Sequence, residues 1–122
     1  MKIKESAENY LEAILMLGEK NSFVRSIDVA NELGFTKASV SVAMKAFREE
    51  EYITINKDGG ITLTEKGLSI AKKVRERHDV IAGVLIKLGV SEENAYADSC
   101  KIEHDISDET FEKLKSFLEK RD

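Results

Sequence analysis

The fold is decided by the stretch SIDVANELGFTKASVSVAMKAFREEEYITINKDGGITLT, residues 26–64 of this 122-residue chain. Its first half predicts two helices, one over Ser26–Leu33 and one from Thr36 to about Glu50. Gly34-Phe35 forms a tight turn between them. Ser26 and Thr36 are the expected N-caps, because a hydroxyl there accepts a hydrogen bond from a free backbone N–H of the first turn. The side chains expected to face inward are Ile27, Ala30 and Leu33, then Val40, Ala43, Met44 and Phe47.

The pattern changes to a period of two in the second half of this stretch. Residues 52–56 and 61–64 alternate apolar and polar side chains, as strands do, and Lys57-Asp58-Gly59-Gly60 between them is a hairpin signal. Two short helices joined by a tight turn and followed by a hairpin indicate a winged helix-turn-helix. The alternative is a helical bundle that carries an incidental hairpin.

The outward face of the second helix has the side chains that DNA contact requires. A helix that enters the major groove presents short polar side chains, while Lys and Arg reach phosphates. Ala38 and Ala43 leave room for close approach. The candidate DNA-binding residues are Arg25, Thr36, Lys37, Ser39, Ser41, Lys45 and Lys57, with Arg48 as a further phosphate contact.

Helices are expected on both sides of this stretch, so the fold class is mainly α. One covers Ser6–Glu19, and a long one begins near Thr64 and ends near Leu88, before Gly89. Shorter helices follow over Ser91–Asp98, over Ser99–Asp105 and from Ser107 to about Lys120. We therefore expect two domains: a winged helix-turn-helix over residues 1–72 and a helical domain over residues 73–122.

Charge is distributed unevenly along the chain. Residues 1–75 hold 12 basic and 11 acidic side chains, whereas residues 76–122 hold 7 and 12. An acidic second half suits cation binding, although a solvated surface explains it equally well. The chain has no apolar run long enough to span a membrane, and its first residues lack a signal-peptide core, so a cytoplasmic protein is expected. The single cysteine, Cys100, excludes an internal disulfide and leaves three roles: buried filler, redox group or metal ligand.

The segment Cys100-Lys101-Ile102-Glu103-His104 is a candidate metal site. Positions i, i+3 and i+4 share a helix face, so Cys100, Glu103 and His104 would converge from one turn. A thiolate, a carboxylate and an imidazole together suit a transition metal of borderline softness. A surface Glu-His pair beside a buried cysteine is the alternative.

The order of elements, the opening Ser6-Ala7-Glu8-Asn9-Tyr10-Leu11-Glu12-Ala13-Ile14 and Arg77-His78 late in the long helix give the chain a resemblance to a known family. From about residue 5 to 120 it resembles the diphtheria toxin repressor and manganese transport regulator family. The resemblance implies a metal-dependent repressor that binds palindromic operator DNA as a homodimer. It also implies metal ligands from three segments, namely Asn9 and Glu12, His78, and Cys100, Glu103 and His104.

Several positions depart from the family pattern. Manganese regulators carry Asp where Asn9 stands and Glu where Cys100 stands, while iron-responsive members carry Met and Cys. Because a thiolate favours Fe(II) over Mn(II), we expect Fe(II), with Mn(II) as the alternative and Co(II), Zn(II) or Ni(II) as substitutes in vitro. Ala82 and Tyr96 replace an acid and a histidine of the iron members' ancillary site. Val42 replaces a base-reading glutamine, so we expect a different operator.

The resemblance implies that metal fixes the spacing of two DNA-reading heads. We expect the dimer to use an apolar stripe of the long helix, comprising Val80, Ile81, Val84, Leu85 and Leu88, although a monomer core explains the same stripe. The chain stops after the last helix, as manganese regulators do. One alternative is a metal-independent regulator that senses an oxidant or organic ligand through Cys100. A metal-dependent hydrolase is disfavoured, because no nucleophile with a placed base is evident.

Overall fold

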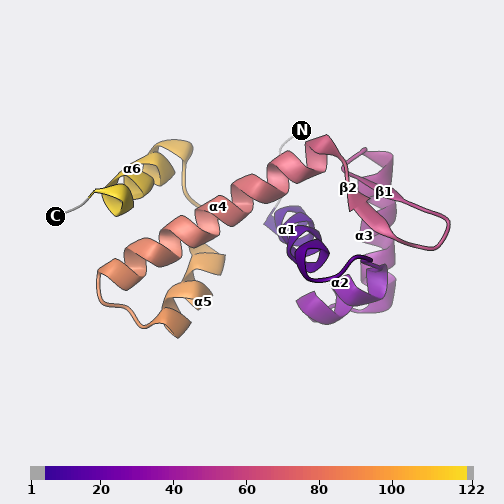
Figure 1. Cartoon of the computed structure of the whole chain (residues 1–122), viewed down its shortest axis with the longest axis horizontal. Coiled ribbons are helices and arrows are strands. Elements are labelled where there is room, and N and C mark those ends of the chain that lie inside the picture. The colour runs from indigo at the N-terminus through magenta and orange to yellow at the C-terminus, as the bar shows by residue number, and fades with distance from the viewer. Residues whose placement is uncertain (1–4, 121–122) are drawn as a thin grey trace. The chain divides into compact units, whose positions relative to one another are not determined.

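The computed structural model describes residues 5–120, which form two compact units divided between Lys72 and Lys73 (Figure 1). Residues 1–4, which belong to the opening segment on which the expectation of no signal peptide rests, lie outside the described part. Within residues 5–120, no helix combines the length and the apolar character that a membrane crossing needs.

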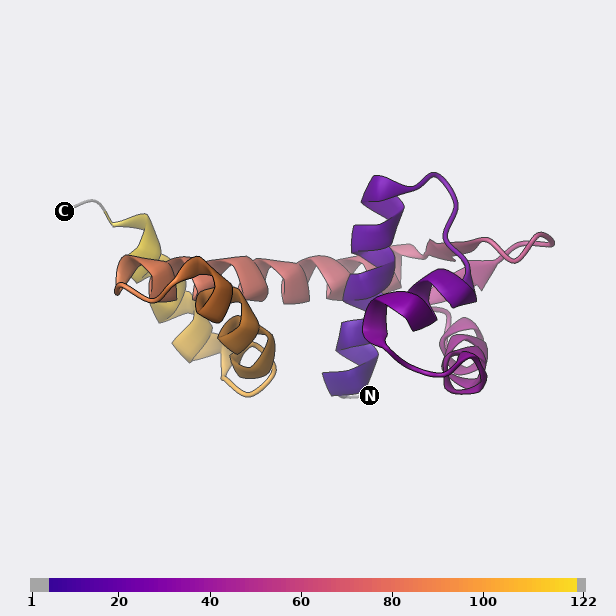
Figure 2. The same cartoon turned by 90° about the horizontal axis from the view of Figure 1, so that it is seen from below.

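The first unit contains three helices, a hairpin and the start of a fourth helix. Its elements are α1 (Glu5–Lys20), α2 (Ser26–Leu33), α3 (Lys37–Glu49), β1 (Ile53–Ile55), β2 (Ile61–Leu63) and the first part of α4 (Glu65–Lys87). The strands pair antiparallel with Thr54 opposite Thr62. In both views the hairpin projects beyond the helices of this unit (Figures 1 and 2). This is the winged helix-turn-helix that the sequence predicts.

The core of the first unit is built from the apolar faces of its helices and strands. Leu11 and Ile14 of α1 are buried. Val40 and Met44 of α3 are buried as predicted, and Ala43 and Phe47 pack against this core. The predicted inward face of α2 was partly wrong. Ile27 is exposed and Val29 is fully buried. An eight-residue helix has about two turns, so its apolar pattern sets its rotation weakly.

The N-caps of α2 and α3 differ from each other. Thr36 caps α3 as predicted, since its Oγ1 accepts a hydrogen bond from the Ser39 N–H at 3.1 Å. Ser26 does not cap α2 but is its first helical residue. Arg25 occupies the cap position, where its N–H donates to the Asp28 carboxylate at 2.9 Å.

The hairpin turn depends on Asn56 and two glycines. Asn56 Oδ1 accepts hydrogen bonds from the N–H groups of Asp58 (2.9 Å) and Gly60 (2.8 Å). Gly59 has φ 85°, which favours glycine, and a Cβ on Gly60 would lie 2.7 Å from the Phe23 ring. The turn therefore requires the residues that the sequence provides.

The second unit consists of the rest of α4 with α5 (Glu92–Ile102) and α6 (Asp108–Glu119). Both shorter helices lie beside α4 (Figures 1 and 2). Ser91 and Ser107 cap α5 and α6 by accepting from Asn94 and Thr110 N–H groups. The two short helices expected over residues 91–105 are one helix, so Cys100 lies in its last turn and Glu103 at its C-cap.

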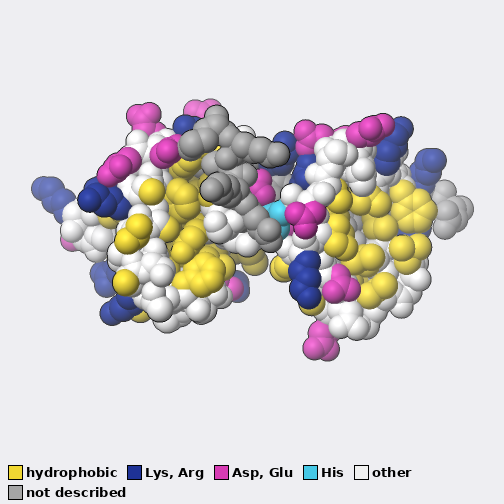
Figure 3. Space-filling model, turned by 180° about the vertical axis from the view of Figure 1, so that it is seen from behind, with side chains coloured by type: hydrophobic (Ala, Val, Ile, Leu, Met, Phe, Trp, Pro, Cys, Tyr) yellow, Lys and Arg dark blue, Asp and Glu magenta, His cyan; other side chains and the backbone are white. Residues whose placement is uncertain are grey.

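The apolar stripe assigned to a dimer interface divides between the interior and the surface. Ile81 and Val84 are buried within this single chain, so they do not form an exposed face. Leu88 is 66% exposed, and Ile86 and Phe117 are also exposed. Hydrophobic side chains gather visibly on the surface of this unit (Figure 3).

Candidate metal centre and DNA-reading helix

The candidate metal centre of the second unit is organised around the imidazole of His78. Its Nδ1 lies 2.9 Å from Glu103 Oε2 and 3.7 Å from Cys100 Sγ. His78 comes from α4, Cys100 from the last turn of α5, and Glu103 from the C-cap of that helix. The structure thus brings His78 together with two residues that lie 22 and 25 positions further along the chain.

Glu103 is the most deeply buried charged residue of this cluster, with 1% of its side chain exposed. Oε2 faces His78, whereas Oε1 has no hydrogen-bond partner among the described residues. His104 Nε2 is 3.3 Å from Oε1, and its side chain is also buried. That separation allows charge interaction, but the two groups are not aligned for a hydrogen bond.

The donor set fits a divalent cation. A buried carboxylate oxygen that accepts no hydrogen bond is unfavourable unless a positive charge compensates it. Imidazole, carboxylate and thiolate are ligands that borderline transition metals accept. His78, Cys100, Glu103 and His104 supply these three ligand types within one unit.

Of the neighbours Cys100 and Ser99, the serine is the buried one. Cys100 is exposed, so the alternative that it is buried filler is wrong. Ser99, which we had placed only at a helix start, is fully buried. Its hydroxyl donates to the backbone carbonyl of His78 at 2.6 Å and lies 3.2 Å from Nδ1 of the same residue. Its spacing of four from Ala95 and from Glu103 was the available signal for this buried face.

Two positions near His78 offer different groups from those of an ancillary metal site. The Tyr96 ring lies 5.5 Å from the His78 ring, centroid to centroid, at 45°. Ala82 is fully buried and has no ligating atom in its side chain.

The remaining predicted ligands, Asn9 and Glu12, lie one helical turn apart on α1 in the first unit.

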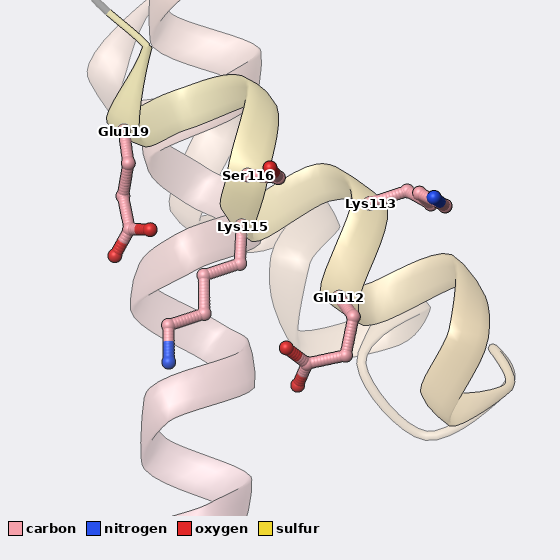
Figure 4. A pocket seen from close by; sticks show the side chains of 5 residues that line it. All are labelled: Glu112, Lys113, Lys115, Ser116 and Glu119. Carbon is pink, nitrogen blue, oxygen red and sulfur yellow. The ribbon is translucent and has the colours of Figure 1, made fainter.

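A hollow of about 450 Å³ lies elsewhere in the second unit, along α6 (Figure 4). Its lining residues are Glu112, Lys113, Lys115, Ser116 and Glu119. Lys115 turns from this helix towards α4, where it donates to Glu76 at 3.0 Å. That hydrogen bond raises the pKa of the Lys115 ammonium. Alternating charges on one helix describe a solvated surface better than a binding site.

In the first unit, α3 presents its predicted DNA-reading residues to solvent. Lys37, Ser39, Ser41 and Lys45 are all exposed on this helix. Val42, between them, is 71% exposed, an unusual apolar group on such a face. The Thr36 hydroxyl is occupied, because it donates to Ser39 Oγ at 2.9 Å besides capping the helix.

The other two predicted DNA-binding residues lie outside α3. Lys57 is exposed in the hairpin turn. Arg25 is exposed at the start of α2, with its guanidinium 4.6 Å from the centre of the Phe23 ring. Both cations are therefore at the surface of the winged unit.

Comparison with known proteins agrees with this geometry. The profile "Iron dependent repressor, N-terminal DNA binding domain" matches residues 2–61, and "Iron dependent repressor, metal binding and dimerisation domain" matches residues 64–122. An HTH-type transcriptional regulator of Methanocaldococcus jannaschii is 38% identical over 97% of this chain and 96% of its own length. The HTH-type transcriptional regulator MntR of Geobacillus kaustophilus is 36% identical over 84% of this chain and 72% of its own.

Solved structures show the same arrangement of elements. The metal-dependent transcriptional regulator MtsR is 26% identical, with a TM-score of 0.84 over 92% of this chain and 53% of its own. The manganese regulator SloR is 26% identical, with a TM-score of 0.80 over 97% of this chain and 54% of its own. The chain thus spans about half the length of these two regulators.

A winged helix-turn-helix together with a helical unit that carries clustered candidate metal ligands is typical of a metal-responsive transcription regulator. The chain belongs to the iron-dependent repressor family, which includes the diphtheria toxin repressor and the manganese transport regulator. It is a metal-dependent transcriptional repressor of this type.

Proposed function

We propose that this chain represses metal-homeostasis genes by binding a palindromic operator as a homodimer when it is metal-loaded. The main support is the convergence of Cys100 and Glu103 on Nδ1 of His78. A second support is the buried Oε1 of Glu103, which accepts no hydrogen bond from the described residues and therefore suits a cation. We further propose that the chain acts in the cytoplasm.

The proposed ligands fall into two groups with different support. His78, Cys100, Glu103 and His104 are supported by their proximity in the second unit. Asn9 and Glu12 are supported by the family resemblance and their spacing on α1. When bound, a divalent cation would supply the positive charge that compensates the Glu103 carboxylate and a Cys100 thiolate.

Fe(II) is the proposed metal and Mn(II) the alternative. Sulfur is a soft ligand, and Mn(II) prefers oxygen and nitrogen, so Cys100 favours Fe(II). The description of the similar protein SloR as a manganese regulator favours manganese instead. Co(II), Zn(II) and Ni(II) are expected to substitute in vitro, following the usual order of affinities.

Metal affinity is expected to depend on pH, and metal binding is expected to be linked to DNA binding. Cysteine and histidine must lose protons to act as ligands, so metal affinity should fall as the pH falls. Ser99 holds the carbonyl of His78, and Glu103 holds its ring, which limits the orientations that His78 can adopt. Reciprocal linkage requires that operator DNA raise the metal affinity as much as metal raises the DNA affinity.

The proposed DNA contacts divide between α3 and the residues around it. Ser39 and Ser41 are placed to read base edges, while Lys37, Lys45, Lys57 and Arg25 are placed to contact phosphates. Two such heads would read half-sites about 34–36 Å apart, as in other dimeric helix-turn-helix proteins. Exposed Leu88 and Phe117 of the second unit offer apolar area for the dimer.

The test is an anaerobic DNA-binding titration with Fe(II), Mn(II), Co(II) and Zn(II) on one duplex. The duplex is selected from a random library by the Co(II)-loaded protein, and a scrambled duplex serves as control. We expect specific binding that requires metal and is reversed by a chelator. Equal binding with metal and with chelator would reject the proposal.

A further inference from the structure

Arg77 of α4 contacts the turn that follows α5 at several points. Nη1 of Arg77 donates hydrogen bonds to the carbonyl oxygens of Glu103 (3.1 Å) and Ile106 (2.9 Å). Nη2 of the same guanidinium pairs with the Asp108 carboxylate at the start of α6. Arg77 thus contacts the end of one helix, the connecting turn and the beginning of the next helix.

An arginine is suited to this position by its shape and charge. Carbonyl groups at the end of α5 have no partner within the helix, and a cation there also interacts favourably with the helix dipole. A planar guanidinium offers several donors in a fixed arrangement, whereas a lysine ammonium is a compact point charge. The Arg77 side chain is 11% exposed and lies over the Phe111 ring, 5.3 Å from its centre.

Arg77 directly precedes His78 on α4, and both side chains contact Glu103, one at its backbone and the other at its carboxylate. The His78 ring faces the Glu103 carboxylate at 2.9 Å, while Arg77 holds the Glu103 backbone carbonyl. His104 is the next residue of the same turn, and its ring lies 3.3 Å from the Glu103 carboxylate. The position of two proposed ligands therefore depends on where this turn is held.

We infer that Arg77 is a positioning residue of the metal centre: it holds the turn of residues 103–108 so that the Glu103 carboxylate faces His78. This inference rests on the proposed metal-dependent function. The competing explanation is that Arg77 only attaches α6 to α4 through Asp108. Asp108 also pairs with Lys73 at 3.5 Å, and both cations, Lys73 foremost, lower the pKa of its carboxyl group.

The two explanations differ in which variants alter metal binding. Arg77→Gln removes the charge and the guanidinium fork, and it should weaken Co(II) binding 10- to 100-fold, as changes next to metal ligands do. It should also change the visible absorption spectrum of the Co(II)-saturated protein. Arg77→Lys keeps the charge, so its Co(II) affinity should lie between those of Arg77→Gln and the wild type. Asp108→Asn leaves both carbonyl contacts in place and should change the Co(II) affinity less than 3-fold.

The experiment measures Co(II) affinity, the Co(II) spectrum and the thermal unfolding temperature of the metal-free protein for these variants and for Lys73→Ala. A purely structural role predicts that Arg77→Gln and Asp108→Asn lower the unfolding temperature equally and bind Co(II) with wild-type affinity and spectrum. That result would overturn the inference. If Arg77→Gln does not fold, Arg77→Lys takes its place in the same comparison with Asp108→Asn. Absence of Co(II) binding by the wild type would instead refute the proposed function.

Discussion

Nδ1 of His78 lies 2.9 Å from Oε2 of Glu103, which joins the middle of α4 to the end of α5. The pair is the centre of the proposed metal site, since Cys100 and His104 approach the same two side chains. Residues that contact this pair are expected to affect metal binding, and residues of α3 are expected to affect DNA binding alone.

Cys100→Glu tests whether the thiol is a ligand. A carboxylate at this position creates the oxygen-rich E-x-x-E-H turn, so the variant should respond better to Mn(II) relative to Co(II) than the wild type does. The thermal unfolding temperature should change little, because Cys100 is already exposed. The measurement is operator affinity in Mn(II) and in Co(II), with Glu112→Ala on α6 as control.

The oxidant-sensing alternative makes a different prediction for the same residue. If Cys100 is a redox group, Cys100→Ser should abolish a response of DNA binding to peroxide and leave the metal preference unchanged. Unaltered metal selectivity in both Cys100 variants would remove the thiol from the metal site.

Lys45→Ala tests the assignment of phosphate contacts on α3. Losing one phosphate contact should weaken binding to specific and scrambled duplexes alike and reduce the log–log salt slope by about one. Ser39→Ala should instead change which sequence is preferred, because Ser39 is placed at base edges. Fluorescence anisotropy at several salt concentrations measures both effects. An unchanged slope for Lys45→Ala would mean that this lysine does not contact phosphate.

Thr36→Ala tests the cap of the reading helix. The hydroxyl that accepts from Ser39 N–H is lost, which should cost about 0.5–2 kcal/mol of unfolding free energy. Thr36→Ser keeps the hydroxyl and should retain most of that stability. Urea unfolding of the free protein separates this effect from any role in DNA contact. Equal stability of the two variants would show that the cap contributes nothing measurable.

A homodimer is expected from the need for two reading heads on one operator, because a single recognition helix buries little surface. Sedimentation velocity at micromolar concentration measures the oligomeric state directly. Leu88→Glu, at an exposed apolar position, should shift the population towards monomer. A wild-type monomer with metal, without metal and with DNA would exclude the proposed assembly.

The winged unit could be predicted closely because its signals are local. The Thr36 cap, the Gly34 turn at φ 72° and the glycine-rich hairpin each require particular residues at particular positions. The rotation of α2 was harder to predict, because Ile27 and Val29 are both apolar and the helix is short. Only packing against neighbouring elements decided which one is buried.

The metal centre could be predicted only in part. Asp98-Ser99 resembles a helix start, because serine is a common N-cap, but the Ser99 hydroxyl is satisfied by the His78 carbonyl inside one continuous helix. Arg77 was noticed only as the neighbour of His78. Two of its acceptors are backbone carbonyls, which every residue has, so no sequence pattern marks them.

The central claim is that metal held around His78 and Glu103 controls DNA binding. The most direct test compares operator affinity in Co(II) and in chelator for the wild type, His78→Ala and Glu103→Gln, after circular dichroism confirms that all three fold. Metal should tighten operator binding by the wild type. In each variant, this metal-dependent gain in operator affinity should be reduced by more than the 10- to 100-fold typical of changes next to ligands. Wild-type activation by Co(II) in both variants would contradict the account.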